Sequence, residues 1–362
     1  MSTKPRLCAN MIVRNESAII ERCCEALARV VDCFVIADTG STDDTPAIIE
    51  RTFARHGISG EIVHTKFVDF EQSRNFALEA ARASKQEFDY ILFCDADMEI
   101  VEDDPSWRSF LDGPVYALKQ RSAFGGVEYP NIRIVRRGHP CRYVGVTHEF
   151  LDAGPYSHLS QLWFIDHQTG ANRVEKYERD IRLLTSDLER NPSNARTVFY
   201  LANSYYDSGQ LESAIEFYRR RMTMDGYRDE IFISQYRVGL ALHRLGDEGG
   251  FFKELLLCYN EFPHRAEAIH ALALHAQRTQ RHHLALGLAN MVVNLPIPVG
   301  GLFVETEVYD WRVADIVAVS LYWVGRSAEA IPINERLLDI VPAGQRERIA
   351  ANLDHCRWAM AR

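Results

Sequence analysis

Short apolar runs alternate with longer amphipathic segments along the first hundred residues. The apolar runs have the length of buried strands, and the segments between them have helical spacing. Strands are predicted at 7–13, 33–37, 61–65 and 90–94, and helices at 16–30, from Thr45 onward and at 70–83. Because strands and helices alternate, the pattern predicts a parallel, doubly wound sheet. Shorter strands at 115–121, 131–137, 142–146 and 162–165 then predict antiparallel strands that complete one end of that sheet.

Beyond residue 174 the pattern is helical throughout, and it repeats. Turn residues recur at Gly209, Gly246, Gln280 and Gly325, at intervals of 37, 34 and 45 residues (246−209, 280−246, 325−280). Eight residues ahead of each turn stands an apolar residue that is expected to point inward: Leu201, Val238, Leu272 and Val317. A period of about 34 residues with helix–turn–helix units is typical of tetratricopeptide repeats, and a generic helical bundle is the alternative.

This change of pattern predicts two domains. Residues 1–170 are expected to form an α/β domain with a Rossmann-like mixed sheet, and residues 171–362 an all-α repeat domain. A final helix at 345–360 is expected to cover the last repeat. The extra length between the third and fourth repeats, at 296–307, is either a loop that reaches an acceptor or an idle insertion.

Composition argues against several classes of protein. The net charge of −9 and the pI near 5.8 disfavour a nucleic-acid binder, which normally carries a basic face. No apolar run approaches the roughly 18 residues of a transmembrane helix, and the run at 7–13 is too short for a signal peptide. The eight cysteines include no Cys-x-x-Cys pair, so neither a zinc site nor a disulfide framework is predicted. The expected location is therefore the reducing cytoplasm.

Two aspartates, Asp95 and Asp97, follow the predicted strand at 90–94. Open α/β sheets place their ligand crevice at the carboxyl ends of parallel strands. Two carboxylates at such a place need a cation, and a divalent metal that also holds a diphosphate satisfies them, because hard cations take carboxylate and phosphate oxygens together. The alternative is that the aspartates only cap the turn after the strand.

Two further residues point to the same edge of the sheet. Asp38 ends the second strand, where its carboxylate is suited to accept an N–H from the edge of a base, although closing an Asx turn is an equally good explanation. Arg74 lies in the first turns of the predicted helix at 70–83, either facing a nucleotide or solvated on the helix surface. Asp43 and Asp44 are expected to be charges at a helix N-terminus without a catalytic role.

Four motifs, in this order and spacing, resemble family 2 glycosyltransferases of GT-A fold. They are Ile12-Val13-Arg14-Asn15-Glu16, Asp38-x-Gly40-Ser41-x-Asp43-x-Thr45, Ser73-Arg74-Asn75-Phe76-Ala77 and Asp95-Ala96-Asp97, and together they cover residues 7 to 100. The resemblance implies that Asp38 contacts the base, Arg74 helps to hold the nucleotide, Asp95 faces the ribose, and Asp97 ligates Mn²⁺ or Mg²⁺ on the diphosphate. One departure is that Ile12-Val13-Arg14-Asn15 stands where the family has Pro-x-Tyr-Asn, which leaves the contacts of that loop to the base open.

A segment further along, Tyr143–Phe150, resembles the Val-x-His-Glu stretch of glycosyltransferases that carry helical repeats. Glu149 is the predicted general base, and His148 is its competitor as base or metal ligand. If the strand continues through them, alternation puts these two side chains on opposite faces. His167 is a second candidate ligand, and the alternative for either histidine is a hydrogen-bonded structural role.

The predicted site thus has two sets of binding residues. The predicted nucleotide-sugar contacts are Val13, Arg14, Glu16, Asp38, Ser41, Arg74 and Asp95, and the predicted metal ligands are Asp97, Asp95, His148 and His167. The resemblance implies an inverting, metal-dependent transferase that moves a sugar from a UDP-sugar to a hydroxyl or thiol. The repeats are expected to recognise a peptide or protein acceptor, a partner that delivers one, or a glycan.

Two rival functions are weighed against this interpretation. One is a repeat scaffold whose nucleotide fold is inactive, which the presence of Asp38, Arg74, Asp95 and Asp97 disfavours. The other is a nucleotidyltransferase, which would need a Gly-rich, Lys-bearing loop that is missing from 7–16. The sugar, the acceptor, the linkage and the oligomeric state, including a homo-oligomer, are left open by the sequence.

Overall fold

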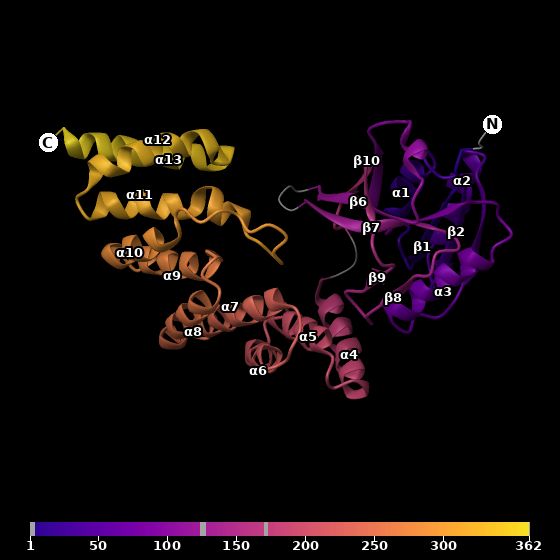
Figure 1. Ribbon diagram of the computed structural model, residues 1–362, viewed down its shortest axis with the longest axis horizontal. Coiled ribbons are helices and arrows are strands. Elements are labelled where there is room, and N and C mark those ends of the chain that lie inside the picture. Colours follow the sequence, from indigo (N-terminus) through magenta and orange to yellow (C-terminus); the bar gives the residue numbers. More distant parts are fainter. Residues whose placement is uncertain (1–3, 124–127, 170–172, 362) are drawn as a thin grey trace. The chain divides into compact units, whose positions relative to one another are not determined.

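The computed structural model describes residues 4–123, 128–169 and 173–361. The chain divides into two compact units, Met1–Asp187 and Leu188–Arg362. The predicted domain boundary between residues 170 and 171 lies outside the described residues and stays a prediction. The predicted fold class, an α/β domain followed by all-α helical repeats, is confirmed (Figure 1).

The first unit is built on an eight-stranded mixed sheet in the order β3-β2-β1-β4-β7-β6-β10-β5. Its strands are β1 (Leu7–Val13), β2 (Cys33–Asp38), β3 (Ser59–His64), β4 (Tyr90–Phe93), β5 (Met98–Glu102), β6 (Val115–Ser122), β7 (Glu128–Arg136) and β10 (Ser157–Asp166). The first four pair in parallel, as the alternation of strands and helices predicts. A two-stranded sheet of β8 (Arg142–Val144) and β9 (Phe150–Asp152) stands beside it.

Helices cover both faces of this sheet. The helices α1 (Ile20–Leu27) and α2 (Thr45–Arg55) lie together on one face, and α3 (Phe70–Ala83) lies on the other (Figure 1). Alternation along β1 explains this arrangement, because Leu7, Ala9 and Met11 join the core under α1 and α2. The intervening Asn10 faces α3, where its Nδ2 donates to the Ala77 carbonyl at 2.9 Å. A short 3₁₀ helix, Trp107–Phe110, follows β5.

Three sequence predictions about the sheet are corrected. The strands β5 and β9 were not predicted, and α1 is shorter than the expected helix at 16–30. The strand β7 pairs antiparallel with β4 and β6 as expected, but β10 runs parallel to β6 and antiparallel only to β5. The reason is the excursion through β8 and β9, which returns the chain to the sheet in the direction of β6.

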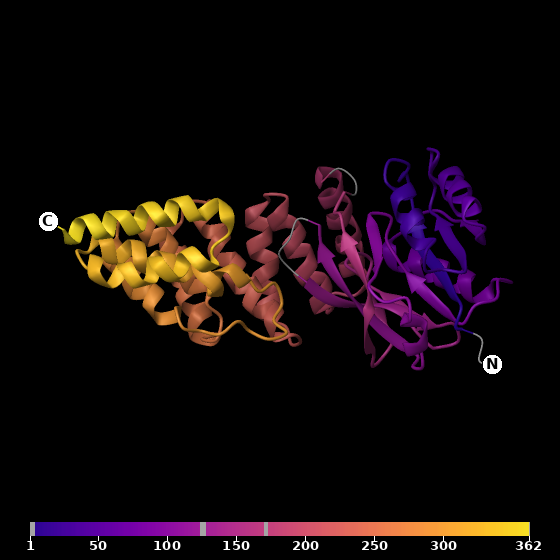
Figure 2. The same ribbon diagram turned by 90° about the horizontal axis from the view of Figure 1, so that it is seen from above.

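The second unit consists of helix pairs that follow one another along the chain (Figure 2). The pairs are α5 (Ala195–Asp207) with α6 (Leu211–Met222), α7 (Arg228–Arg244) with α8 (Glu248–Glu261), α9 (Glu267–Arg278) with α10 (His282–Val292), and α11 (Val313–Trp323) with α12 (Ser327–Ile340). A helix α4 (Arg173–Arg190) precedes them, a π-helical turn (Val308–Arg312) leads into α11, and α13 (Ala343–Met360) ends the series. No helix among the described ranges is both long and apolar enough to cross a membrane.

The turns inside the four pairs share one backbone conformation. Gly209, Gly246 and Gly325 have φ between 77° and 85°, and Gln280 has φ 59° at the matching position. This left-handed conformation favours glycine, so the repeat keeps its turn geometry at Gln280 without the favoured residue. The four residues expected to point inward, Leu201, Val238, Leu272 and Val317, are all buried. The predicted tetratricopeptide-like repeats are thereby confirmed.

Candidate functional site

The loops that follow β1 and β2 are tied to each other by hydrogen bonds. The backbone N–H of Asn15 donates to Ser41 Oγ at 3.1 Å, and the N–H of Glu16 donates to Thr45 Oγ1 at 2.7 Å. Asp43 accepts from the Ser17 N–H at 3.1 Å and from the Thr45 hydroxyl at 2.6 Å. Asp43 therefore joins the two loops, which is a larger structural role than the helix-terminal charge predicted for it.

Asp38 is buried between two partners at the end of β2. Its Oδ1 accepts from the Ser41 N–H at 3.0 Å, which is the turn-closing role weighed for it, and its Oδ2 lies 3.2 Å from His64 Nδ1. The side chain of His64 is 70% exposed, so this partner is free to move without disturbing the core. Of the other predicted contacts in these loops, Val13 is buried and its carbonyl accepts from Thr39, whereas Arg14 is exposed.

The helix α3 is fixed to the loop around Gly145, and this brings Arg74 to Glu149. Asp69 caps the helix by accepting from the Gln72 N–H at 2.7 Å. Asn75 bonds to both backbone groups of Tyr143, accepting from its N–H at 2.8 Å and donating to its carbonyl at 2.9 Å. Arg74 directly precedes Asn75 on this helix, so its direction is set by the motif around it.

Arg74 joins Asp95 to Glu149. Its Nη2 lies 2.5 Å from Asp95 Oδ1, and its Nε donates to Glu149 Oε1. The other Asp95 oxygen lies 3.1 Å from Arg133 Nη2. Burial opposes the charge of Asp95, but Arg74 and then Arg133 outweigh it and hold the pKa of that carboxyl well below its usual range. Asp95 is therefore an ionised carboxylate between two guanidinium groups.

Arg133 is the site residue that sequence reasoning missed. It is buried on β7, and its Nε and Nη2 both lie near Gln120 Oε1 of β6, at 3.2 and 3.1 Å. The neighbouring Arg136 and Arg137 are not part of this ion-pair chain, since they donate to main-chain carbonyls. The available signal was alternation, because an arginine within an apolar strand needs a buried counter-charge.

The second aspartate of the pair, Asp97, lies in an acidic environment. Burial raises its pKa, and the carboxylates of Asp95 and Asp166 raise it further. Burial likewise raises the pKa of Glu16 to about 7, with Asp97, Asp43 and Asp95 as the next causes. Oxygen donors that repel one another in this way suit a hard divalent cation, which would relieve the repulsion. The residues present therefore fit a dication at Asp97.

The two candidate histidine ligands have different surroundings. His167 Nε2 is 3.1 Å from Glu99 Oε2, although the His167 backbone N–H donates to the Asp97 carbonyl at 3.2 Å. His148 is exposed and has φ 51°, because β8 ends at Val144 and a turn follows. The argument from strand alternation at His148 and Glu149 therefore fails. Among the described residues no three His, Cys, Asp or Glu side chains are arranged to hold a metal, so the metal ligands stay a prediction.

The raised pKa of Glu16 predicts a pH-dependent gain in stability for Glu16→Gln. A carboxyl group whose pKa is raised from 4.5 to about 7 on folding stabilises the folded state at low pH, and this stabilisation is lost as the pH rises through that interval. We expect metal-free Glu16→Gln to unfold at a higher temperature than the natural chain at about pH 8, and the gain to shrink towards about pH 5. Calorimetry at both pH values measures this, with the exposed Glu61→Gln as the matched control. An equal gain at both pH values would contradict the assignment.

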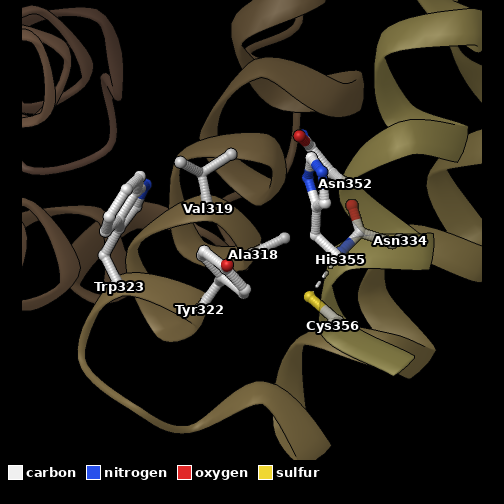
Figure 3. Close-up of a pocket in the computed structure, with 8 residues that line it drawn as sticks. All are labelled: Ala318, Val319, Tyr322, Trp323, Asn334, Asn352, His355 and Cys356. Atoms are coloured by element: carbon white, nitrogen blue, oxygen red, sulfur yellow. Dashed lines mark hydrogen bonds between the residues drawn. The ribbon is translucent and has the colours of Figure 1, made fainter. Parts of the chain in front are cut away.

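A small pocket lies within the second unit, between α11, α12 and α13 (Figure 3). Its lining comprises Ala318, Val319, Tyr322, Trp323, Asn334, Asn352, His355 and Cys356. None of these is a residue of the site predicted from the sequence.

Parts of this chain are similar in sequence to known proteins. The sequence model of glycosyl transferase family 2 matches residues 8–106. A TPR repeat-containing protein of Synechococcus elongatus is 34% identical in an alignment of 151 residues that covers 39% of this chain. The chain spans only 34% of the length of that relative.

Solved structures with some likeness belong to two kinds of protein. S. aureus TarS, residues 1–349, has 15% identity and a TM-score of 0.38 over 71% of this chain and 92% of its own. The MamA protein has 18% identity and a TM-score of 0.36 over 46% of this chain and 82% of its own.

The family match covers the segment that holds Asp38, Arg74, Asp95 and Asp97, and the strand order and helical repeats agree with the two parts predicted from the sequence. Residues 8–106 of this chain thus match glycosyl transferase family 2, and the helices that follow form tetratricopeptide-like repeats.

Proposed function

We propose that this chain is a metal-dependent, inverting glycosyltransferase that uses a UDP-sugar. The observation that carries the proposal is the ion-pair chain from Glu149 through Arg74 to Asp95, beside the acidic environment of Asp97. Arg74, Asp95 and Asp97 lie in the segment that matches the family 2 glycosyltransferase model. A transferase has a role for each of these carboxylates: Glu149 as the base, Asp95 as a donor-binding group and Asp97 as a metal ligand. A binding scaffold requires none of them.

The donor nucleotide is proposed to be held by residues at the ends of β2 and β4. Asp38 would accept an N–H of the uracil edge in place of His64, which is exposed enough to move away. Asp95, kept ionised by its two arginines, would accept hydrogen bonds from the ribose hydroxyls. Because both Asp95 oxygens already have guanidinium partners, Asp97 is the better candidate to hold Mn²⁺ or Mg²⁺.

The proposed chemistry needs a leaving group, a base and an acceptor. A dication bound at Asp97 would supply the positive charge that makes the UDP diphosphate a good leaving group. Glu149 would take the proton of the acceptor hydroxyl or thiol while its oxygen or sulfur bonds to the anomeric carbon. The bond from that carbon to the diphosphate breaks, and UDP leaves. Arg74 holds the Glu149 carboxylate in place by their ion pair.

Metal-dependent binding of UDP is the result that tests this proposal. We expect Mn²⁺ to tighten UDP binding, because a dication held by Asp97 would offset the negative charge of the diphosphate. Asp97→Asn should abolish the effect of Mn²⁺ without unfolding the protein, since it removes the charge and keeps the shape. Isothermal titration calorimetry with Mn²⁺ and with EDTA measures both effects. The matched control is Asp103→Asn, which changes an exposed carboxylate outside the Asp95 and Asp97 pair.

Equal UDP affinity with and without metal would remove the enzymatic proposal in this form and leave an inactive scaffold. If Mn²⁺ does tighten UDP binding, a panel of UDP-sugars, with UDP release measured in Mn²⁺ and in EDTA, would identify the sugar. We further propose a cytoplasmic enzyme whose repeats engage a peptide, protein or glycan acceptor.

A further inference from the structure

The insertion between α10 and α11 packs against the first helices of three repeats. Its central residues, 300–305, form what we call the inserted segment, and Figures 1 and 2 show this loop leaving α10 and returning to α11. The residues that contact it come from α5, α7 and the start of α9. Neither sequence expectation, a free reaching loop or an idle insertion, describes this arrangement.

The backbone of the inserted segment forms hydrogen bonds with charged side chains. The Leu302 N–H donates to Asp229 Oδ2 at 2.6 Å, and Arg265 Nη2 donates to the Leu302 carbonyl at 3.2 Å. The Glu305 N–H donates to Glu267 Oε1 at 3.4 Å. Arg265 and Glu267 are almost completely buried, and they also pair with each other at 2.8 Å. Side chains that bind backbone groups in this way hold a peptide through its main chain, whatever its sequence.

Two side chains of the inserted segment provide the specific contacts. The ring of Phe303 stacks on Phe199, with centroids 6.5 Å apart, and the Arg237 guanidinium lies 5.8 Å from the centre of the Phe303 ring. The Glu305 Oε1 accepts from the Tyr236 hydroxyl at 3.1 Å. An aromatic ring followed two residues later by a carboxylate is therefore what this surface receives.

The inserted segment fits this surface imperfectly. Phe303 has φ 49°, a left-handed conformation that is strained for a residue with a side chain, and 48% of it is exposed. Burial raises the pKa of Glu305, and Glu267 adds to the rise, so its charged form is less favourable here than in water. A free peptide is able to make the same contacts without the constraints of a loop.

We propose that this surface is a peptide-binding site whose built-in ligand is the inserted segment. We call it the peptide face, and it consists of Phe199, Asp229, Tyr236, Arg237, Arg265 and Glu267. Its partner is a peptide that carries an aromatic residue and, two positions later, an acidic one, and that follows the path of residues 300–305 on this surface. Phe303 and Glu305 occupy the site until such a peptide displaces them. The apparent affinity for the peptide is therefore the intrinsic affinity multiplied by the fraction of molecules in which the site is vacant.

The test measures binding of a fluorescent, end-capped peptide, Gly-Gly-Leu-Phe-Val-Glu, which copies residues 300–305. In the full chain, Phe303→Ser with Glu305→Gln removes the built-in anchors and leaves the peptide face intact. We expect this variant to bind the peptide about 10- to 100-fold more tightly than the natural chain, by fluorescence polarisation. A peptide with Ser for Phe and Gln for Glu is the control and should not bind. Neither nucleotide nor metal enters the measurement, so its outcome is independent of the proposed transferase activity.

Three results would overturn the proposal. They are equal affinity of the variant and the natural chain, equal binding of the control peptide, and unchanged binding after Arg237→Met is added to the variant to remove the contact with the aromatic ring. The single change Phe303→Ser, at a half-exposed residue, keeps the test valid if the double change unfolds the repeats. It should tighten binding in the same direction.

Discussion

Replacing Glu149 with glutamine is expected to lower kcat by a factor of about 10² to 10⁴, which is the usual worth of a general base. Glutamine keeps the shape of the side chain and an acceptor for Arg74 Nε, so the ion-pair chain loses a charge but not its geometry. UDP binding should therefore change little, because the step that fails is removal of the acceptor proton. Steady-state UDP release with a saturating donor measures kcat, and calorimetry measures UDP binding on the same sample.

A matched control separates the role of Glu149 from a general loss of charge. Glu79 lies on α3 with a largely exposed side chain that pairs with Arg82, and Glu79→Gln should leave kcat unchanged. The competing base is tested by His148→Ala, which should retain most of the activity. If His148→Ala loses as much kcat as is predicted for Glu149→Gln, and the latter stays active, the base is His148 and our assignment is wrong.

The sequence predicted those parts of the fold that rest on local pattern. The helix at 70–83 coincides with α3 because apolar spacing, the Asp69 cap and the end at Ser84 all agree. The repeat turns were found from their period, and even Gln280 was placed correctly because the period does not need its glycine. The strand β5 was missed because it begins directly after the Asp95 turn, where the acidic residues hid its apolar alternation.

Contacts between residues that are far apart in the sequence could not be predicted from the local hydrophobic pattern. The motifs placed Arg74 and Asp95 at the same edge of the sheet, but nothing in their spacing indicated that they pair or that Arg133 of β7 binds the other Asp95 oxygen. The bend that gives His148 a positive φ is set by Gly145 and by the anchoring of the Tyr143 backbone to Asn75. The inserted segment was recognised as extra length, whereas its contacts with α5, α7 and α9 depend on the tertiary stacking of the repeats.

Removing Arg74 is expected to produce the largest loss of stability in the first unit. Arg74→Met leaves Glu149 without its guanidinium partner and Asp95 with only Arg133, and breaking a mostly buried pair in this way costs about 3–5 kcal/mol. Hydrogen exchange of amides in β4 and α3 reports the opening of this unit separately from the repeats. Because Arg74 and Arg133, against the effect of burial, hold the pKa of Asp95 below its usual range, that carboxylate stabilises the fold above its ordinary pKa and loses this effect in acid. The cost of Arg74→Met should therefore shrink as the pH falls.

The double variant Arg74→Met with Glu149→Gln shows whether this loss is electrostatic. If the unpaired Glu149 charge is what destabilises the single variant, removing that charge should recover part of the lost protection, by a coupling of about 0.5–3 kcal/mol. Activity should not recover, because the proposed base is absent as well. A double variant that is no more protected than Arg74→Met alone would indicate that Arg74 acts through its packing over Tyr143, and the ion-pair chain would then lose its place as the element that organises the site.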